Sequence, residues 1–245
     1  MKRPLIEACV DSYASAMAAS RAGADRLELC AHLVIGGTTP THALFRQVQR
    51  GSGVPINVLI RPRFGDFLYT EPELEEMCEE IAAFRDLGAN GVVIAEPVAG
   101  LLSPALSAEF SGPYVKQIVD AVQDDSFLVI YHNCGNSTIQ MIDSILETGS
   151  AAYHFGNAID MAEMMTHIPA GTVAMGNVDP AGEFRNGTPE SIRAATLGVM
   201  DACCKYPNFV ISSGCDIPPL SRWENIDAFF AAVNEFYAGT AAGRG

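Results

Sequence analysis

The sequence predicts a protein of the α/β class, folded as a (β/α)8 TIM barrel. Three observations predict it: short apolar runs alternate with longer amphipathic ones, there are eight of each, and the 245 residues suit a barrel of about 250 residues. An open doubly wound sheet is the main alternative, but it more often carries a glycine-rich phosphate loop after the first strand. The segment LIEACVDSYAS at residues 5–15 contains no such loop.

The predicted strands are short apolar runs bounded by turn or polar residues, as buried parallel strands usually are. They cover residues 5–10, 26–30, 56–62, 91–96, 127–133, 151–157, 172–178 and 208–214. The amphipathic runs predict helices at residues 12–22, 41–50, 71–87, 104–123, 138–148, 160–167, 188–204 and 223–237. Because each strand is followed by a helix and no such segment is left over, the count favours a closed (β/α)8 barrel.

Several helix ends carry recognisable signals. In TPESI, Thr188 is expected as the N-cap, with Pro189 in the first helical position. Gly23 and Gly88 follow two other helices and are expected in the left-handed conformation that ends a helix. The tail AGTAAGRG, residues 238–245, is small and polar, which predicts a disordered end after a single domain of residues 1–237.

Composition excludes several classes of partner. The formal net charge is −14, so nucleic acid and anionic membrane surfaces are not expected to bind. We find no signal segment at the N-terminus and no apolar stretch of the roughly 18 residues that a membrane helix needs. The seven cysteines are scattered and odd in number, which favours a reducing cytoplasmic location over a disulfide framework.

In a (β/α)8 barrel, functional residues lie on the loops that follow the strands. This rule separates candidates at strand ends from polar residues on helices, such as His42 and His167, which are expected to be solvated. The candidates are Glu7, Cys9, Cys30, Arg61, Arg63, Glu96, His132, Cys134, Asn157, Asp179 and Cys215.

The segment VIYHNCGN contains two metal-ligand types at a strand end. Alternation along a strand sends His132 and Cys134 to the same side, and barrel closure is expected to bring Cys215, after the eighth strand, towards them. One imidazole and two thiolates suit zinc, and three protein ligands leave a fourth tetrahedral position open, as in catalytic sites. The alternative is a histidine that only hydrogen-bonds and cysteines that only pack.

Residues from about 89 to 237 resemble the uroporphyrinogen decarboxylase superfamily, and more closely its cobalamin-dependent methyltransferase branch. The resemblance is carried by GVVIAEPVAGLLSP, YHNCGN, AYHFGNAIDM, MGNVDPAGEFRNGTPESI and ISSGCDIPP. It implies a zinc ion on His132, Cys134 and Cys215 that holds a thiol substrate as thiolate, ready to accept a methyl group from a corrinoid protein.

Residues 1 to about 90 instead resemble the copper-homeostasis CutC family, also a (β/α)8 barrel, through LIEAC, AGADRLELC, GGTTP, IRPRFGDFLY and LGANGVVI. The join falls near residues 88–95, where both families read alike. We interpret the chain as an engineered half-barrel chimera, with a natural recombinant as the alternative. The resemblance implies that Cys9 and Cys30 bind copper, whereas apolar surroundings favour simple packing.

Other polar residues at strand ends allow two interpretations each. Arg61 and Arg63 share a strand face and predict a site for an anionic ligand or cofactor, but an ion pair with Glu7 or Glu28 explains them as well. Glu96 and Asp179 are the candidate catalytic carboxylates; the latter also suits a cap on the following loop.

Three functions therefore compete. The favoured one is a chimeric scaffold that has lost its parents' full activity and retains the zinc site. The others are a zinc-dependent methyltransferase acting on a small thiol, with a corrinoid protein as partner only if activity survives, and a copper-binding protein of CutC type. Because side chains of different origin meet where the halves join, the sequence also predicts poor packing at both seams, strand four against five and strand one against eight.

Overall fold

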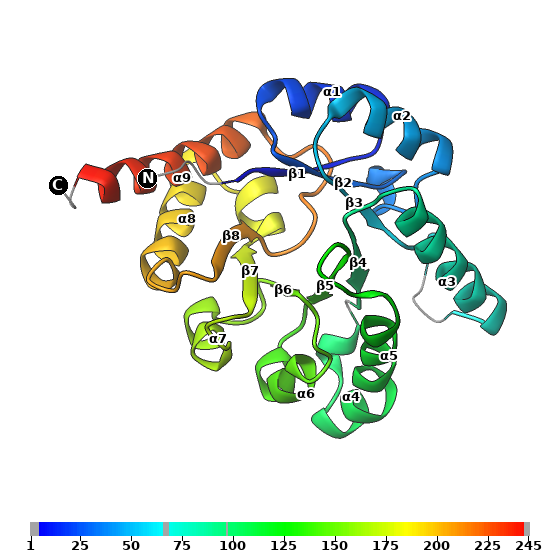
Figure 1. The fold of residues 1–245 in the computed structure, drawn as a ribbon. Helices are drawn as coiled ribbons and strands as arrows, with labels where there is room; N and C mark the ends of the chain where they lie inside the picture. Colours follow the sequence, from blue (N-terminus) through cyan, green and yellow to red (C-terminus); the bar gives the residue numbers. More distant parts are fainter. Residues whose placement is uncertain (1–4, 66–68, 97, 243–245) are drawn as a thin grey trace.

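The structure is a computed structural model that describes residues 5–65, 69–96 and 98–242. Eight parallel strands form one curled sheet in chain order, and they follow one another around a ring with helices outside it (Figure 1). The predicted (β/α)8 fold is confirmed. The strands are β1 (Glu7–Val10), β2 (Arg26–Leu29), β3 (Ile56–Leu59), β4 (Gly91–Ala95), β5 (Leu128–Asn133), β6 (Ala152–Phe155), β7 (Val173–Val178) and β8 (Phe209–Ser213).

At least one helix follows every strand, as the alternating pattern predicts. The α-helices are α1 (Tyr13–Ala22), α2 (His42–Ser52), α3 (Glu71–Asp86), α4 (Pro104–Phe110), α5 (Gly112–Val122), α6 (Ile142–Leu146), α7 (Met161–His167), α8 (Pro189–Cys203) and α9 (Trp223–Ala242). In the part of the chain that the structure describes, no helix is both long and apolar enough to cross a bilayer.

The predicted helix signals hold where they can be examined. The Thr188 hydroxyl caps α8 by accepting a hydrogen bond from the Ser191 N–H, and Pro189 begins the helix. Gly23 after α1 and Gly88 after α3 have φ angles of 99° and 90°, which a residue without a Cβ adopts at little cost.

Three segments differ from the prediction. The helix expected at 104–123 is two helices that meet at Ser111, because Pro113 lacks the N–H that a continuous helix needs and instead suits the first turn of α5. The segment expected to be disordered is helical as far as Ala242, while 243–245 lie outside the described residues. An unpredicted π-helical turn, Pro180–Arg185, precedes α8.

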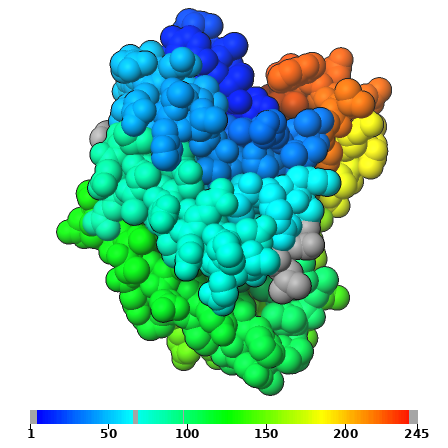
Figure 2. Space-filling model, turned by 90° about the vertical axis from the view of Figure 1, so that its right-hand side faces the viewer, coloured from blue at the N-terminus to red at the C-terminus, as the bar shows by residue number. Residues whose placement is uncertain are grey.

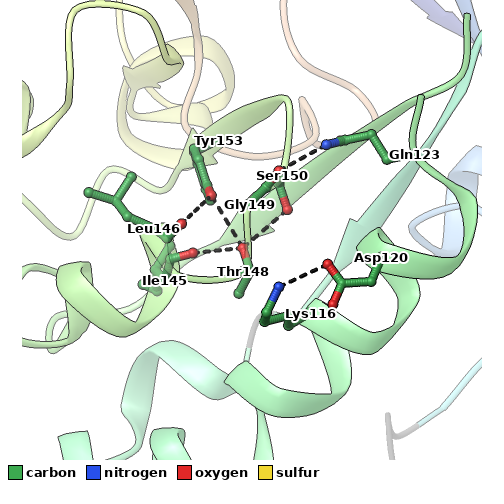
Figure 3. A network of polar contacts seen from close by, with 9 residues as sticks. All are labelled: Lys116, Asp120, Gln123, Ile145, Leu146, Thr148, Gly149, Ser150 and Tyr153. Atoms are coloured by element: carbon green, nitrogen blue, oxygen red, sulfur yellow. Dashed lines mark hydrogen bonds and ion pairs between the residues drawn. The ribbon is translucent and has the colours of Figure 1, made fainter. Parts of the chain in front are cut away.

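Side chains between the strands and the helices form the core around β5 and β6. Tyr131 and Tyr153 are buried there with their ring centroids 6.4 Å apart in an edge-to-face arrangement. The Tyr153 hydroxyl donates to the Leu146 carbonyl at 3.2 Å and lies 3.2 Å from the Thr148 hydroxyl, as Figure 3 shows. Gln123, at the end of α5, donates to the Gly149 carbonyl at 2.9 Å. These bonds satisfy the buried hydroxyls and fix α5 and α6 against the sheet.

The ring has one paired seam and one open seam. At the β4–β5 seam the strands pair over five positions, from Gly91 opposite Leu128 to Ala95 opposite His132. Among the described residues, no backbone hydrogen bond joins β8 to β1. The expectation of a hydrogen-bonded closed barrel is therefore wrong at this one position.

Figure 2 shows the outer surface of these regions. The cyan residues lie directly against the green ones. A notch separates the blue N-terminal residues from the orange residues near β8.

Candidate metal centre

Three side chains from two distant segments meet at the carboxyl ends of β5 and β8. His132 lies within β5, Cys134 follows that strand, and Cys215 follows β8. The ligand atoms of all three lie within 4.8 Å of one another. The structure thus brings together the three residues that the sequence singled out, even though the ring is open between β8 and β1.

Glycines make the close packing around Cys134 possible. A Cβ at Gly156, after β6, would lie 2.4 Å from the Cys134 Cβ. A Cβ at Gly100, in the loop after β4, would lie 2.5 Å from the Cys134 carbonyl oxygen, and a Cβ at Gly135 would lie 2.3 Å from Gly100. Real Cβ contacts do not occur at such distances, so side chains here would push the Cys134 backbone out of place. The glycines in YHNCGN and YHFGN therefore position the thiol.

The two thiols have unequal proton affinities. A hydrogen bond from the Cys215 thiol lowers the pKa of Cys134, while that same bond and burial raise the pKa of Cys215. The Cys215 Sγ also lies 3.7 Å from Nε2 of His132 and 3.2 Å from Oδ1 of Asp216. A bound cation would replace the shared proton, since thiolates rather than thiols ligate metals.

His132 fits a metal in one respect and lacks a usual partner in another. Its Nε2 faces the thiols, and the side chain is only 6% exposed, so this nitrogen is shielded from water. Its Nδ1 is buried and has no hydrogen-bond partner within the described residues. Ligating histidines usually donate that second N–H to a carbonyl or carboxylate. The three donors suit zinc, but the support behind the imidazole is incomplete.

His154 is a residue at the site that sequence reasoning missed. It lies opposite His132 in the β5–β6 register, and the two ring centroids are 4.6 Å apart. Its Nε2 donates to the Ser213 carbonyl at 2.8 Å. Burial, and next the charge of His132, lower the pKa of His154 to about 3, so the ring is neutral. Alternation in AYHFGN places His154 on the same face as the residue two positions later, Gly156, but a histidine between apolar residues is equally typical of a core position.

Both candidate catalytic carboxylates already bind groups of the protein. Glu96 accepts hydrogen bonds from the hydroxyls of Tyr131 at 2.7 Å and Ser111 at 2.6 Å. Asp179 accepts from the backbone N–H groups of Ala181 at 2.9 Å and Gly182 at 2.8 Å, which is the capping alternative that the sequence allowed. A catalytic role for Glu96 and Asp179 stays a prediction.

The arginines proposed for an anion site are also engaged. Arg61 is 9% exposed and donates to the carbonyls of Gly37 at 3.2 Å and Gly65 at 3.3 Å. Arg63 forms an ion pair with Glu73, and its guanidinium lies 5.4 Å from the ring centroid of Tyr69. The acidic partner is therefore neither Glu7 nor Glu28. The anion-binding role of Arg61 and Arg63 stays a prediction.

The second pair of candidate metal ligands lies on β1 and just after β2. The Sγ atoms of Cys9 and Cys30 are 4.0 Å apart. Cys30 is buried; Cys9 is exposed as a whole residue, but its thiol is largely enclosed by protein. The hydrogen bond between the two thiols, followed by burial and by the charge of Glu28, raises the pKa of Cys9.

Comparisons with known proteins find both of the families that the motifs resemble. A family profile for uroporphyrinogen decarboxylase (URO-D) matches residues 74–236, more than half of the chain. The chain belongs to the uroporphyrinogen decarboxylase family. The match begins within α3, before the join expected near residues 88–95.

The other matches are to CutC proteins. A CutC family protein of Mesorhizobium japonicum is 52% identical over 90 residues, 37% of this chain and 35% of that protein. The human copper homeostasis protein cutC homolog is 48% identical over 89 residues, 36% of this chain and 33% of that protein. In both cases the chain matches only about a third of the relative's length. A CutC family protein of Enterobacter is 35% identical over 151 residues, 60% of this chain and 57% of that protein, so this likeness is longer than the N-terminal 90 residues.

Solved structures of both kinds share the fold of this uroporphyrinogen decarboxylase family member. A methyltransferase from Methanosarcina mazei has a TM-score of 0.63 at 20% identity, over 82% of this chain and 68% of that one. A putative copper homeostasis protein CutC from Streptococcus agalactiae has a TM-score of 0.57 at 22% identity, over 85% of this chain and 98% of that one. At these identities the likeness shows the fold alone, and a chimera of the two families is consistent with all of these matches.

Proposed function

We propose that this protein is a half-barrel chimera that retains a zinc centre on His132, Cys134 and Cys215 and binds a thiol there. The single observation that carries the proposal is the convergence of the three ligand atoms within 4.8 Å, from β5 and from the end of β8. Zinc on three protein ligands has a fourth tetrahedral position, where it makes a thiol lose its proton at neutral pH.

The chain's own residues would prepare such a site in three ways. Cys134, whose pKa is lowered, is the thiol that most readily becomes an anion. His132 presents Nε2 from a buried position, so water has little access to this nitrogen. The glycines at 100, 135 and 156 hold the Cys134 backbone close to its neighbours. Together these features favour binding of a soft divalent cation and a thiol.

Methyl transfer from a corrinoid carrier is the reaction that the methyltransferase branch of the family would contribute. It requires a pocket as well as a metal, and the loops after β1, β2 and β3 belong to the CutC-like segment. Three ligands suffice for metal binding, whereas catalysis requires placement to within about half an ångström. We therefore propose that the metal centre survives while turnover is lost, and that the chain was engineered as a scaffold.

The test measures zinc by elemental analysis in the wild type and in the Cys134→Ala, Cys215→Ala double variant. The matched control is Cys78→Ala, an exposed cysteine on α3. We expect near-stoichiometric zinc in the wild type and in the control, and none in the double variant. Zinc retained in the double variant, or absent from the wild type after loading, contradicts the proposal.

A second measurement separates a metal-binding scaffold from an enzyme. The zinc-loaded protein is incubated with methylcobalamin and a small thiol, and loss of the methyl–cobalt absorption is followed. We expect no acceleration over free zinc at equal concentration. Acceleration that disappears in the double variant would instead establish the methyltransferase.

Copper binding is a second candidate function, favoured by the 4.0 Å separation of the Cys9 and Cys30 sulfur atoms. Two thiolates at this spacing suit Cu(I), a soft cation. The test titrates Cu(I) against a chromophoric chelator with the wild type, Cys9→Ser and Cys78→Ser. Copper taken up by the wild type and Cys78→Ser, but not by Cys9→Ser, supports this site. Equal uptake by all three rejects it.

A further inference from the structure

We propose that His154, which is not itself one of the three ligands, is the positioning residue that brings Cys215 into the metal centre. The inference rests on the proposed function, because it concerns how the same centre is assembled. It comes from one hydrogen bond between β6 and the end of β8, and from the ring contact that the same side chain makes with His132.

The backbone just before Cys215 is held by a neighbouring strand on one side only. β7 pairs with β8 as far as Val178 opposite Ser213, and the next residue, Gly214, donates its N–H to the Val178 carbonyl at 2.7 Å. On the other side of β8, the described residues make no backbone hydrogen bond to β1. The strand that leads to Cys215 therefore lacks the second neighbour that a closed ring would supply.

The side chain of His154 replaces part of that missing support. In a parallel pair of strands, alternate residues direct their backbone groups to the same neighbour. Gly214 directs its N–H to β7, so the carbonyl of Ser213, one residue earlier, points away from β7. This carbonyl accepts a hydrogen bond from Nε2 of His154 at 2.8 Å. A side chain of β6 thus fixes the backbone two residues before the third ligand.

The same imidazole also lies against the first ligand. His154 is opposite His132 in the register of β5 and β6, and the two ring centroids are 4.6 Å apart at an interplanar angle of 38°. One end of the side chain therefore contacts a ligand on β5, while its N–H holds the end of β8. A residue in this place determines how far apart the two ligand-bearing segments lie.

Backbone packing after β6 supports this role. A Cβ at Gly156 would lie 2.4 Å from the Cys134 Cβ, and a Cβ at Gly214 would lie 2.6 Å from the backbone nitrogen of Asn157. The residues that follow β6 thus approach the second ligand on one side and the residue before the third ligand on the other. β6 carries no ligand, yet it contacts the segments of all three.

Three substitutions separate positioning from the filling of space. His154→Phe keeps a planar ring beside His132 but has no N–H. In His154→Gln the amide nitrogen is as many bonds from Cβ as Nε2 is, so it can donate to the same carbonyl. In His154→Asn the amide nitrogen is one bond too short. The Gln and Asn variants are equally polar, so they remain a matched pair if His154→Phe does not fold.

The test titrates Co²⁺ in place of zinc into the full chain, because thiolate ligands give Co²⁺ a charge-transfer absorption. For His154→Phe and His154→Asn we expect binding about 10- to 100-fold weaker than in the wild type, the usual effect of removing a group that orients a ligand. The absorption should fall to that of Cys215→Ala, and His154→Gln should restore both. The control, His167→Phe at the exposed end of α7, should match the wild type.

Two results would overturn the inference while leaving the metal centre in place. One is wild-type affinity in His154→Phe. The other is an equal loss in the Gln and Asn variants, because the hydrogen bond would then not be what matters.

A metal-free measurement separates this inference from the proposed function. Dibromobimane bridges two nearby thiols, and the cross-linked Cys134–Cys215 peptide is quantified by mass spectrometry. We expect the wild type and His154→Gln to yield severalfold more of it than the Phe and Asn variants. If the wild type binds no Co²⁺, the proposed function is wrong and the cross-link alone decides. Equal yields in all variants, or no cross-link in the wild type, overturn the inference.

Discussion

The two seams between the proposed half-barrels behave differently, although each brings a CutC-like segment against a uroporphyrinogen decarboxylase-like one. At the β4–β5 seam the strands pair over five positions, and Asn90 contacts both neighbouring strands: its side chain accepts from the Ile56 N–H at 3.0 Å and its carbonyl accepts from the Leu128 N–H at 2.9 Å. At the β8–β1 seam the described residues make no backbone hydrogen bond. The strands pair fully at the β4–β5 seam, where the chain continues from one segment into the other. β8 and β1, which are far apart in the sequence, do not pair.

Charge gives a physical reason for the open seam. Glu7 on β1, Glu28 on β2 and Asp216 after β8 are carboxylates. Burial, and next the charges of Glu7 and Asp216, raise the pKa of Glu28. Drawing β8 against β1 would bring these carboxylates closer together, with Arg26 as the cation paired among them. No such repulsion between carboxylates arises at the start of β4, because Gly91, Val92 and Val93 are uncharged.

The largest expected effect comes from breaking the paired seam. A Cβ at Gly91 would lie 2.3 Å from the carbonyl oxygen of Leu128 on β5, so Gly91→Ala should force the two strands apart. We expect a loss of about 3 kcal/mol in the free energy of unfolding, measured by urea denaturation. Gly171→Ala is the control, because nothing lies within 4 Å of a Cβ there. Equal stability of the two variants would show that the seam is not tightly paired.

The next prediction compares hydrogen exchange at the two seams. The N–H of Cys9 points away from β2, because the carbonyl of the following residue, Val10, accepts from the Cys30 N–H at 3.0 Å. It therefore faces the open seam. The Leu128 N–H, by contrast, donates across the paired seam. We expect peptides that cover β1 to exchange at least about tenfold faster than peptides that cover β5. Equal protection would mean that β8 and β1 pair in solution.

A smaller effect is expected from the pH dependence of stability. Burial and neighbouring carboxylates raise the pKa of Glu28 from 4.5 to about 7, so the folded protein binds more protons than the unfolded chain between these values. The stability that Glu28 contributes is therefore present below about pH 4.5 and lost as the pH rises to about 7. In Glu28→Gln we expect about 1–3 kcal/mol less decline over that range. Parallel pH profiles from thermal unfolding of the two proteins would contradict this.

Sequence reasoning succeeded where a local pattern determines the structure. Alternation along β5 placed His132 and Cys134 on one face, and the motif after β8 supplied Cys215, so the candidate ligands converge. It missed His154, because a histidine between apolar residues looks like a core position until the strand register is known. It predicted a closed ring by counting strands, but whether the first and last strands pair depends on contacts between segments far apart in the chain, which a count of strands does not show.

The partners of long, flexible side chains were also beyond the sequence. Arg63 pairs with Glu73 at the start of α3, ten residues along the chain, and not with a carboxylate on a neighbouring strand. That choice depends on how the loop after β3 turns, which no periodic pattern encodes. Predictions from alternation and capping are therefore more dependable here than predictions of ion pairs.

The close approach of Gly100 to Cys134 has a consequence for building other proteins. Both residues, and the glycines at 135 and 156, lie after the join, so the steric framework of the ligand cluster is contained within the second segment. The second segment therefore holds the ligand cluster in place through contacts to Cys134 from its own residues. An N-terminal half-barrel from another family, provided that its fourth strand begins with glycine opposite Leu128, would receive the three ligands already arranged.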